Sequence, residues 1–553
     1  MRHFIAVVIS VLLFNVGISY AQNTHSDPLL MRDPAVGENT DILRNNRFEE
    51  TDPPTGEPRF VAEFEPMQGV TIRYPLGIPE SLVAAFADNC QVYCIVSDSC
   101  QNEAFQVFTE VGVNMNHVTF VIAPTDDFFV RDYGPWYIFE DKQPAIVDNL
   151  YYPEFRPKDD SISFVFSEFW NIPLYGMNLQ YEGGNIMEDG RGQGVSDAAV
   201  LLQNNNDEEN LRAKMRDYLG IDPFHLLISD YYGHVDCWGK YLAPDKILIA
   251  RVPENNAYYD TFEEIANYFS SANCCWGYPY RVYRVDFPNI NHNTVAPYTN
   301  SLILNKTVYL PISDNETYNQ SAVEVYRDAM PGYEIVTVEG SENTPWRPGD
   351  ALHCRTRGIM DFDMLFVDHR NVLYGEQTWQ DSIPVVSKFI AYSGANLKQD
   401  SLLVYYSIDG GAYQTAHMTA TGNPDEYVGY ITGYERGSEI DYYVFSADES
   451  GHRYTQPVFA DLDPHHFTIE LHQSITEFSN DTKLYPNPTT SQFTVEGANV
   501  AKVEVYNLVG QKVCEQQGSK VVNIDATSWH KGIYLVNIIE ENGAVVAKKL
   551  VVK

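Results

Sequence analysis

The feature that most constrains the fold is a repeated alternation of strand and helix patterns from about Phe60 to about residue 370. Short apolar runs such as GVTIRYP, VTFVIAP and KILIARVP alternate with helical patterns such as PESLVAAFADN and TFEEIANYFSSA. Apolar runs of about four to eight residues between turn signals are typical of strands, whereas helical periodicity needs longer segments. The sequence therefore predicts an α/β domain, over residues 56–372, that repeats one strand and helix unit.

Two all-β regions follow this domain. After about residue 375 the helical patterns stop, and DSLLVYYSIDGGAYQTAHMTA, EYVGYITG and EIDYYVFSADESG alternate strand patterns with turn signals. This alternation predicts a small β-sandwich of immunoglobulin type over residues 373–472. A polar spacer separates it from residues 480–553, where short strands and sharp turns predict a second compact β module.

The N-terminus has the pattern of an export signal. MRHFIAVVISVLLFNVGISYAQ combines a short basic start, an apolar run from Phe4 to Val16 and small residues up to Ala21. This pattern predicts a cleavable signal peptide over residues 1–21, and it is too short for a membrane anchor. Residues 22–55 carry little periodicity and are interpreted as a linker or propeptide. We therefore expect export into an oxidising compartment and no membrane-spanning segment.

The charge balance restricts the partners. The chain holds 75 Asp and Glu residues against 37 Lys and Arg residues, a formal net charge of −38. Nucleic acid is not an expected partner, because its phosphates bind basic surfaces. An acidic surface is most often just a solvated surface, but it would also attract cationic substrates.

The eight cysteines are sparse for a disulfide scaffold of 553 residues. Neither a CxxC pair nor a regular zinc spacing occurs. Disulfides in an oxidising exterior are an open alternative for a subset, which comprises Cys90, Cys94, Cys100, Cys274 and Cys275. Cys354 has no near neighbour of its own kind in the sequence, so it needs another explanation.

Five stretches concentrate polar residues where predicted strands end. They are RDYGPW (131–136), YEGGN (181–185), GHVDCWGK (233–240), PYTNS (297–301) and DALHCRT (350–356). Each has an ordinary structural explanation when taken alone, such as a surface ion pair, a glycine turn or a buried small thiol. Together they supply a thiol, an imidazole and three carboxylates, from Asp132, Glu182 and Asp236. This combination predicts a site that binds a cation and attacks it.

The carboxylates and the thiol make conflicting demands. A thiolate is the attacking species, so nearby positive charge must lower the pKa of Cys354, whereas carboxylates alone would raise it. The conflict is resolved if the substrate brings the positive charge. A planar guanidinium does so, and it can donate its N–H groups to two carboxylates.

The motifs also carry a family resemblance. The set RDYGP, EGGN, GHVD, TNS and HCRT resembles the guanidino-group-modifying enzymes, and among them the agmatine deiminases and the Porphyromonas-type peptidylarginine deiminases. GHVDCWGKYLAP, PYTNSLILN and DALHCRT are most similar to the peptidylarginine branch. The resemblance covers roughly residues 55–370 and implies a five-bladed αβ propeller, the pentein fold. It implies no metal and no organic cofactor.

The last module resembles another known domain. Its YPNP, VYNLVGQKV, GIYLV and basic KKLVVK stretches are similar to the C-terminal sorting domain of proteins exported by type IX secretion. The resemblance implies that the type IX machinery is a partner. It also implies a secreted protein or one attached to the outer cell surface.

The resemblance to the deiminases implies roles for individual residues. Cys354 is expected to attack the guanidinium carbon, and Asp132 and Asp236 are expected to bind the guanidinium nitrogens. His234 is expected to act as general acid and then as general base. Ammonia would leave, a covalent S-alkylthiouronium would form, and water would release citrulline. Asn300 matches a further active-site position of the peptidylarginine branch.

Three more residues are expected at the substrate. Glu182 matches a carboxylate that supports the histidine in agmatine and arginine deiminases. YYPEFRPKDD (151–160) falls where the peptidylarginine branch can place paired arginines for a substrate carboxylate, but only Arg156 is placed for this and Glu154 opposes it. The loop around Tyr231 is expected to contribute to substrate binding. We therefore expect a weaker preference for C-terminal arginine than a two-arginine pocket would give.

The function expected from the sequence is a secreted peptidylarginine deiminase that converts arginine of peptides and proteins, including C-terminal arginine, to citrulline and ammonia. A deiminase of agmatine or free arginine is an alternative, against which the signal peptide and the sorting domain argue. A noncatalytic surface binding protein is another, against which the intact Cys, His and double Asp set argues. A cysteine protease could use Cys354, His234 and Asn300, but three acidic residues facing a thiol would have no purpose.

Overall fold

The computed structural model describes residues 48–151, 156–229, 231–288, 298–471, 482–518, 520–541 and 545–553. The expected signal peptide (1–21) and most of the expected linker (22–55) lie outside these residues. The chain divides into two compact units. The first contains residues up to Tyr374 with Ser382–Thr432 and Ile440–His466, and the second contains Gly375–Asp381, Gly433–Glu439 and Phe467–Lys553.

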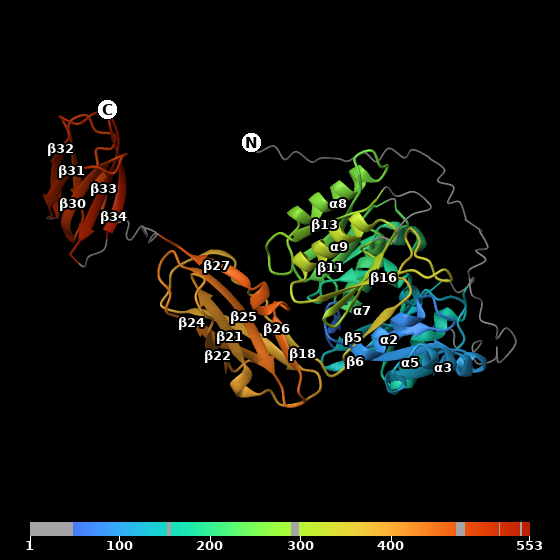
Figure 1. The fold of residues 1–553 in the computed structure, drawn as a ribbon. Coiled ribbons are helices and arrows are strands. Elements are labelled where there is room, and N and C mark those ends of the chain that lie inside the picture. The colour runs from blue at the N-terminus through green and yellow to red at the C-terminus, as the bar shows by residue number, and fades with distance from the viewer. Residues whose placement is uncertain are drawn as a thin grey trace. The chain divides into compact units, whose positions relative to one another are not determined.

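The first unit begins with an α/β part whose strands lie between residues 58 and 360 (Figure 1). The strands are β1 (Pro58–Phe60), β2 (Met67–Arg73), β3 (Gln91–Val96), β4 (Val118–Ile122), β5 (Trp136–Glu140), β6 (Gln143–Leu150), β7 (Leu174–Gln180), β8 (Met187–Glu188), β9 (Gly194–Asp197), β10 (Phe224–Leu227), β11 (Gly239–Ala243), β12 (Lys246–Arg251), β13 (Arg281–Asp286), β14 (Leu302–Leu304), β15 (Thr307–Ile312), β16 (Glu334–Glu339) and β17 (Arg357–Met360).

These strands form five small sheets among the described residues. Their orders are β17-β2-β3-β4, β1-β5-β6-β7, β10-β9-β8, β11-β12-β13 and β14-β15-β16. In each sheet an antiparallel pair, such as β11 with β12, is extended by a parallel strand, such as β13. β17 pairs with β2, so the last strand of this part joins a sheet that begins near its start. The α/β class predicted from the sequence is confirmed.

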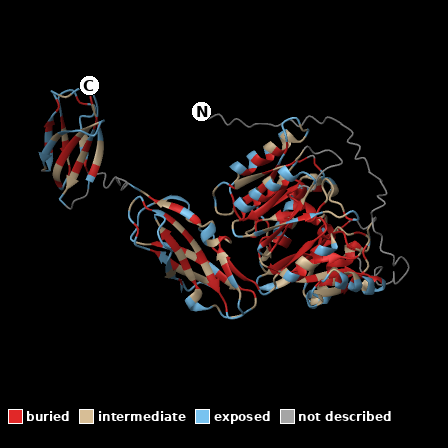
Figure 2. Ribbon diagram, in the orientation of Figure 1, coloured by how far each residue is buried: buried red, intermediate tan, exposed pale blue. Residues whose placement is uncertain are grey.

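Most of the helices connect the parallel strands of a sheet, whereas the short helix Val130–Tyr133 lies between β4 and β5, which belong to different sheets. The helices are α2 (Glu80–Asn89), α3 (Gln101–Glu110), α4 (Val130–Tyr133), α5 (Ile162–Trp170), α6 (Ala199–Gln203), α7 (Glu208–Leu219), α8 (Tyr259–Ser271) and α9 (Glu316–Ala329). α8 buries Phe262, Ile265, Ala266 and Phe269, which share one helix face. The neighbouring strand β12 is buried except at Arg251, and Figure 2 shows the buried strands in the interior. A strand covered on both faces reads as a continuous apolar run, as KILIA does.

The first unit also contains most of a second, all-β part. β18 (Leu365–Asp368), β20 (Ile383–Ala391), β23 (Thr419–Ala420) and β24 (Glu426–Ile431) form one sheet. β21 (Leu403–Ile408) pairs with β22 (Gln414–His417) and with β25 (Glu439–Ala447), which pairs with β26 (Arg453–Gln456). Burial alternates along β20, as expected for a strand with one face on a core. β18 lies within the range predicted for the α/β domain, yet it pairs with β20.

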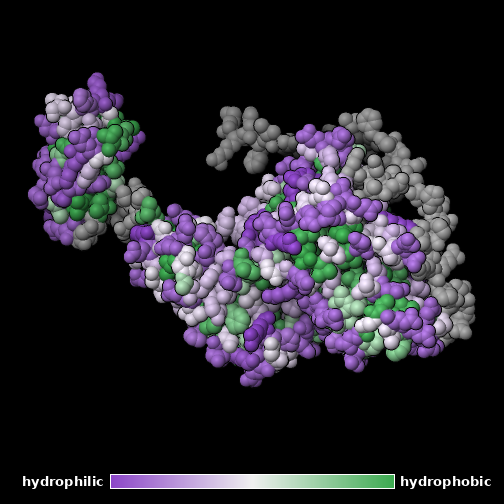
Figure 3. Space-filling model, viewed as in Figure 1, coloured by the Kyte–Doolittle hydropathy of each residue, from purple (hydrophilic) through white to green (hydrophobic). Residues whose placement is uncertain are grey.

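The second unit ends in a compact β module. Its strands are β28 (Lys483–Tyr485), β29 (Gln492–Glu496), β30 (Val500–Asn507), β31 (Lys512–Gln517), β32 (Val521–Asp525), β33 (Gly532–Glu540) and β34 (Val545–Val552), and β19 (Gly375–Gln377) pairs with β27 (His465–Ile469) elsewhere in this unit. The sheets β28-β29-β32 and β31-β30-β33-β34 enclose Phe493, Val503 and Val536. Figure 3 shows hydrophobic residues gathered on one side of this module.

Two properties concern the whole described chain. All eight cysteines are free thiols, so the disulfides considered from the sequence are not formed. Among the described residues, no helix has the length and apolar character needed to cross a membrane.

Candidate active site

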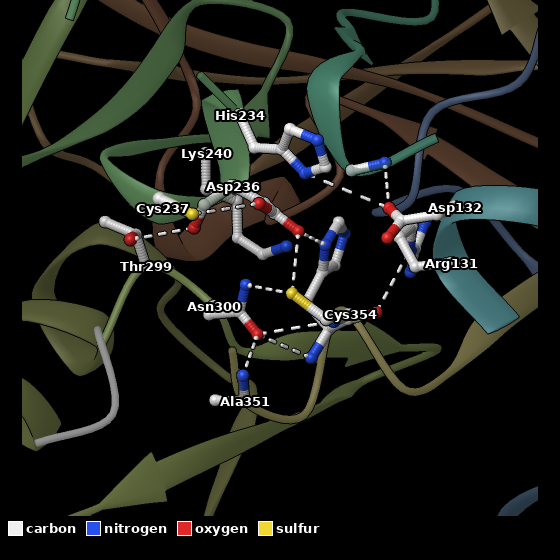
Figure 4. Close-up of polar contacts among 12 residues, drawn as sticks. Arg131, Asp132, His234, Asp236, Cys237, Lys240, Thr299, Asn300, Ala351 and Cys354 are labelled. Atoms are coloured by element: carbon white, nitrogen blue, oxygen red, sulfur yellow. Dashed lines mark hydrogen bonds and ion pairs between the residues drawn. The ribbon is translucent and has the colours of Figure 1, made fainter. Parts of the chain in front are cut away.

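All five polar stretches contribute residues to short turns that meet in the α/β part, and Figure 4 labels residues from four of these turns. RDYG forms α4, EGGN forms the 3₁₀ turn η4 (Gly183–Asn185), and HVDC forms the 3₁₀ turn η5 (Val235–Cys237). Thr299 and Asn300 lie in the turn before β14, and His353 and Cys354 lie in the turn before β17. Pro297, the first residue of PYTNS, lies outside the described residues. Turns at strand ends are where a rigid scaffold positions functional side chains.

Asn300 fixes the position of Cys354. Its amide nitrogen lies 3.1 Å from the sulfur of Cys354. Its carbonyl oxygen accepts hydrogen bonds from the backbone N–H groups of Ala351, His353 and Cys354, at 3.2, 3.0 and 3.3 Å. One buried side chain therefore holds both the turn and the thiol. The sulfur also lies 3.5 Å from Oδ2 of Asp236, and the residue is only 4% exposed.

His234 stands between two carboxylates on the other side of the site. Its Nε2 lies 2.8 Å from Oε2 of Glu182, and its Nδ1 lies 3.9 Å from Oδ1 of Asp132. The backbone N–H of Gly184 donates to the same Oδ1 at 3.0 Å. Glu182 thus orients the imidazole, and Asp132 is held by a backbone donor.

Three polar atoms converge on the space beside Gly184. A Cβ atom added to this glycine would lie 2.7 Å from Oδ1 of Asp132, 2.8 Å from Nδ1 of His234 and 3.0 Å from Oδ2 of Asp236. The absence of a side chain at Gly184 therefore lets these three polar atoms face one another, where a group that donates hydrogen bonds could contact them. From the sequence, Gly184 was interpreted only as part of a turn, and the GG pair gave no further signal.

The electrostatics of the site disfavour a free thiolate. Burial and the carboxylates of Asp236, Asp350 and Asp132 raise the pKa of the Cys354 thiol well above its ordinary value. The hydrogen bond from Asn300 acts in the opposite direction and is outweighed. The conflict inferred from the sequence is thus present in the structure. A cation bound beside Gly184 would lower the pKa of this thiol, because it favours the charged form.

His234 and Asp132 have shifted pKa values as well. Burial would lower the pKa of His234, but the hydrogen bond and charge of Glu182, with the charges of Asp132 and Asp236, raise it to about 10. Burial, Glu182 and Asp236 raise the pKa of Asp132 to about 8, although His234 opposes this. At neutral pH the imidazole is therefore protonated and able to donate a proton. Shifted pKa values of this kind cluster at functional sites.

The pKa of Asp132 leads to an expected pH dependence of cation binding. Only the ionised carboxylate attracts a guanidinium, so its affinity should rise from pH 6 to pH 8 and then level off, because the raised pKa of Asp132 is about 8. Well below this pKa the slope should approach about tenfold per pH unit. Calorimetric titration of the Cys354→Ala variant with an arginine peptide measures it. The control is Asp132→Asn, which should remove the dependence of affinity on pH. Equal affinities at pH 6 and pH 8 in the Cys354→Ala variant that retains Asp132 would contradict the assignment.

Arg156 lies in a set of contacts of its own. It forms an ion pair with Asp127 at 2.7 Å and donates to the hydroxyl of Tyr151 at 2.6 Å. Tyr151 lies close enough to Asp132 and Glu182 for both charges, after burial, to raise its pKa. Arg156 is therefore near the site but is already engaged by a carboxylate. Glu154, which was expected to oppose it, lies outside the described residues.

Tyr231 is placed differently from the other expected residues. It is 3% exposed and packs against Tyr258 and Phe262 in the core. Its neighbour Tyr232 is 56% exposed and has a φ of 55°, and its ring lies where a Cβ on Gly349 would be. The structure thus brings together Cys354, His234, Asp236, Asp132, Asn300 and Glu182, but it places Tyr231 among aromatic rings. The exposed ring of this pair belongs to Tyr232.

The α/β part is similar to known proteins. A solved structure titled "putative agmatine deiminase" matches with a TM-score of 0.51 and 20% identity, over 57% of this chain and 99% of that one. A curated relative named "Putative agmatine deiminase" from Vibrio parahaemolyticus is 23% identical over 348 residues, which is 54% of this chain and 96% of the relative. One of the same name from Legionella pneumophila is 21% identical over 263 residues, or 44% and 75%. The α/β part therefore has the fold of the deiminases.

The family follows from a more specific match. The family model described as Porphyromonas-type peptidyl-arginine deiminase covers residues 59–359, which is more than half of the chain. This chain belongs to that family, as its motifs predict. The model of the secretion system C-terminal sorting domain covers residues 483–553. The predicted sorting domain and the predicted type IX export, to the exterior or the cell surface, are confirmed.

Proposed function

We propose that this chain is a secreted peptidylarginine deiminase that hydrolyses arginine of peptides and proteins to citrulline and ammonia. The observation that carries the proposal is the convergence of Asp132, His234 and Asp236 on the space beside Gly184, close to a thiol. Two carboxylates can accept the N–H groups of a guanidinium there. The substrate then supplies the positive charge that the thiol of Cys354 requires.

The first half of the proposed reaction forms a covalent intermediate. The bound guanidinium lowers the pKa of the Cys354 thiol, which releases its proton to solvent, and the resulting thiolate attacks the guanidinium carbon. His234, a partly exposed imidazolium hydrogen-bonded to Glu182, donates a proton to one nitrogen. That nitrogen leaves as ammonia, and a thiouronium cation linked to the sulfur is formed.

The second half releases the product. His234 has lost its proton and accepts one from a water molecule, which attacks the thiouronium carbon. The carbon–sulfur bond breaks with its electron pair on sulfur, which restores the thiolate. The added hydroxyl group loses its remaining proton to solvent, and citrulline leaves. Asn300 contributes throughout by holding the sulfur and the turn that carries it.

The proposal extends to the architecture. The five sheets of the α/β part correspond to the blades of the expected propeller, and the sheets between residues 365 and 469 correspond to the expected immunoglobulin-like domain. The expected boundaries, 56–372, 373–472 and 480–553, are proposed with one change. Because β18 pairs with β20, the second domain begins near Leu365.

Substrate choice separates the proposal from its main alternative, a deiminase of agmatine or free arginine. Export by type IX secretion supports a peptide substrate, because it delivers the enzyme to extracellular proteins. The test measures citrulline-type product and ammonia from an arginine peptide, agmatine and free arginine in parallel. We expect kcat/KM to be highest for the peptide. A higher value for agmatine would replace the proposal by its alternative, and no ammonia from any of the three would overturn both.

Arg156 is proposed to contact the carboxylate of a C-terminal arginine. Since Asp127 already engages its guanidinium, the preference for C-terminal over internal arginine should be modest. Arg156→Ala should raise KM about tenfold or more for peptides ending in arginine, because a charge-assisted hydrogen bond contributes about 1.5–3 kcal/mol. Peptides with amidated C-termini are the control and should change little. An equal rise for both peptide types would remove Arg156 from carboxylate recognition.

A further inference from the structure

A second histidine, which the reaction above does not use, lies beside the thiol. His353 directly precedes Cys354, is 2% exposed, and bridges two carboxylates. Its Nδ1 lies 2.8 Å from Oδ2 of Asp236, and its Nε2 lies 2.7 Å from Oε2 of Glu63. Contacts this short require a proton between each nitrogen and its oxygen. Burial, followed by the charges of Arg131 and Lys240, lowers the pKa of His353, whereas Glu63 and the hydrogen bond to Asp236 raise it and favour the protonated ring. The ring therefore links Asp236, which is proposed to bind the guanidinium, to the carboxylate of Glu63.

The carboxylate of Glu63, which binds this ring, is itself held in position by three donors. Its Oε1 accepts from Lys240 Nζ and from the backbone N–H of Ile303, both at 2.9 Å. Its Oε2 accepts from Arg131 at 2.8 Å. These donors belong to three segments that also carry active-site residues, because Arg131 adjoins Asp132, Lys240 follows η5 and Ile303 lies in β14. An imidazole bound to a carboxylate held in this way is fixed in orientation.

His353 makes the shortest of the polar contacts described for the carboxylate of Asp236. Besides the 2.8 Å contact to His353, its oxygens face the sulfurs of Cys237 at 3.6 Å and Cys354 at 3.5 Å. Thiols are weak donors. Burial would raise the pKa of Asp236, but the hydrogen bond and charge of His353, followed by the charges of His234 and Arg131, lower it. Asp132 lies farther from its imidazole, at 3.9 Å from Nδ1 of His234, and burial with the charges of Glu182 and Asp236 raises its pKa to about 8.

We propose that His353 is a positioning residue, which keeps Asp236 ionised and directs its Oδ2 toward the space where the guanidinium binds beside Gly184. This inference rests on the proposed function. It assigns different tasks to the two histidines, since His234 transfers protons to and from the reacting groups, whereas His353 acts only through Asp236. The site then presents one permanently charged carboxylate and one, Asp132, that ionises as the cation arrives.

Two substitutions separate this role from simple packing. In His353→Asn the side-chain amide can take the place of Nδ1 and still donate to Asp236, whereas in His353→Gln it takes the place of Nε2 and serves only Glu63. We expect His353→Asn to keep kcat/KM for an arginine peptide within about tenfold of the parent. His353→Gln should lose about a hundredfold or more, since an uncharged or misdirected Asp236 weakens a charge-assisted contact. Equal losses in both variants would overturn the inference.

A second measurement does not depend on turnover. It compares the rates at which the cationic 2-chloroacetamidine and the neutral 2-chloroacetamide alkylate Cys354. The ratio of the two rate constants reports how strongly the site attracts a planar cation. We expect a high ratio in the parent and in His353→Asn, and a ratio at least about tenfold lower in His353→Gln. Adding Asp236→Asn to His353→Gln should lower it no further, because residues acting through one contact are not additive. A parental ratio in His353→Gln would overturn the inference.

The outcomes for this inference and for the proposed function are distinct. Citrulline formation by the parent with unchanged ratios in both His353 variants would refute only the role of His353. A parent that forms no citrulline and shows no preference for the cationic reagent would refute both. Thermal unfolding of each variant shows whether it is folded. If His353→Gln is not folded, His353→Ser takes its place, and we expect the same loss of activity and of preference for the cationic reagent. The smaller serine side chain would adjoin a cavity of about 40 Å³ that His353 lines.

Discussion

Cys354→Ala and Cys354→Ser are expected to abolish citrulline formation while the protein stays folded. Either substitution removes the nucleophile, and loss of a nucleophile usually costs several orders of magnitude in rate. The serine variant preserves the size of the side chain, but its hydroxyl does not ionise in the range in which a bound guanidinium can activate a thiol. The measurement is citrulline release from an arginine peptide, together with the unfolding temperature of each variant.

Cys237→Ala is the matched control for this prediction. The sulfurs of Cys237 and Cys354 both lie near the carbonyl oxygen of Gly349, at 3.5 and 3.7 Å. Both thiols are buried, and burial raises the pKa of both. We expect Cys237→Ala to retain at least about a tenth of the activity, because the described hydrogen bond from the Asn300 amide goes to Cys354 and not to Cys237. Activity above about a hundredth of the parent in Cys354→Ser would exclude the covalent mechanism.

Gly184→Ala is expected to lower kcat/KM by about a hundredfold or more. The added methyl carbon would lie within 3.0 Å of polar atoms of Asp132, His234 and Asp236, so it would occupy the space assigned to the guanidinium. A methyl group cannot donate hydrogen bonds to these carboxylates, and it would leave them with poorer partners. The measurement is steady-state kinetics with an arginine peptide, combined with the alkylation of Cys354 by a cationic reagent.

Two other glycines are the controls. A Cβ at Gly532 would meet nothing within 4 Å, so Gly532→Ala should leave activity unchanged. A Cβ at Gly183 would lie 2.1 Å from the backbone oxygen of Arg131, so Gly183→Ala should destabilise the fold itself. Gly184→Ala with parental kinetics would show that the guanidinium binds elsewhere.

The apolar periodicity of the sequence predicted helices and strands well where these elements pack in the core. KILIARVP became β12, and TFEEIANYFSSA became most of α8, because strands and helices within a core carry strong apolar periodicity. The sheet to which a strand belongs is not a local property. β18 has the same apolar character as its neighbours in the chain, and only its pairing with β20 places it in the second domain.

The site was predictable to the extent that its residues lie in compact motifs. Cys354, His234 and Asn300 stand at strand ends in stretches rich in polar residues, and family resemblance related them to one another. Glu63 and His353 were missed, because the contact that joins them links positions 290 residues apart. The role of Gly184 was missed for the same reason, since it depends on atoms from two other turns.

Tyr231 shows a different limit of prediction. Alternation along a strand tells which of two neighbours faces a site, but this rule applies only to extended backbone. Tyr232 has a φ of 55°, in the left-handed region, and Gly233 follows with a φ of 70°. Such a turn reverses the direction of successive side chains. The sequence could therefore indicate this loop but not which tyrosine is exposed.

The most direct test of the proposed chemistry follows the guanidinium carbon itself. An arginine peptide labelled with ¹³C at that carbon is mixed with the enzyme and quenched with acid during the first turnovers, and the fragment containing Cys354 is analysed by mass spectrometry. We predict that the labelled carbon, with the rest of the peptide and without one nitrogen, is bound to Cys354 before citrulline accumulates. Accumulation of labelled citrulline with no label on Cys354 at any quench time would contradict this account.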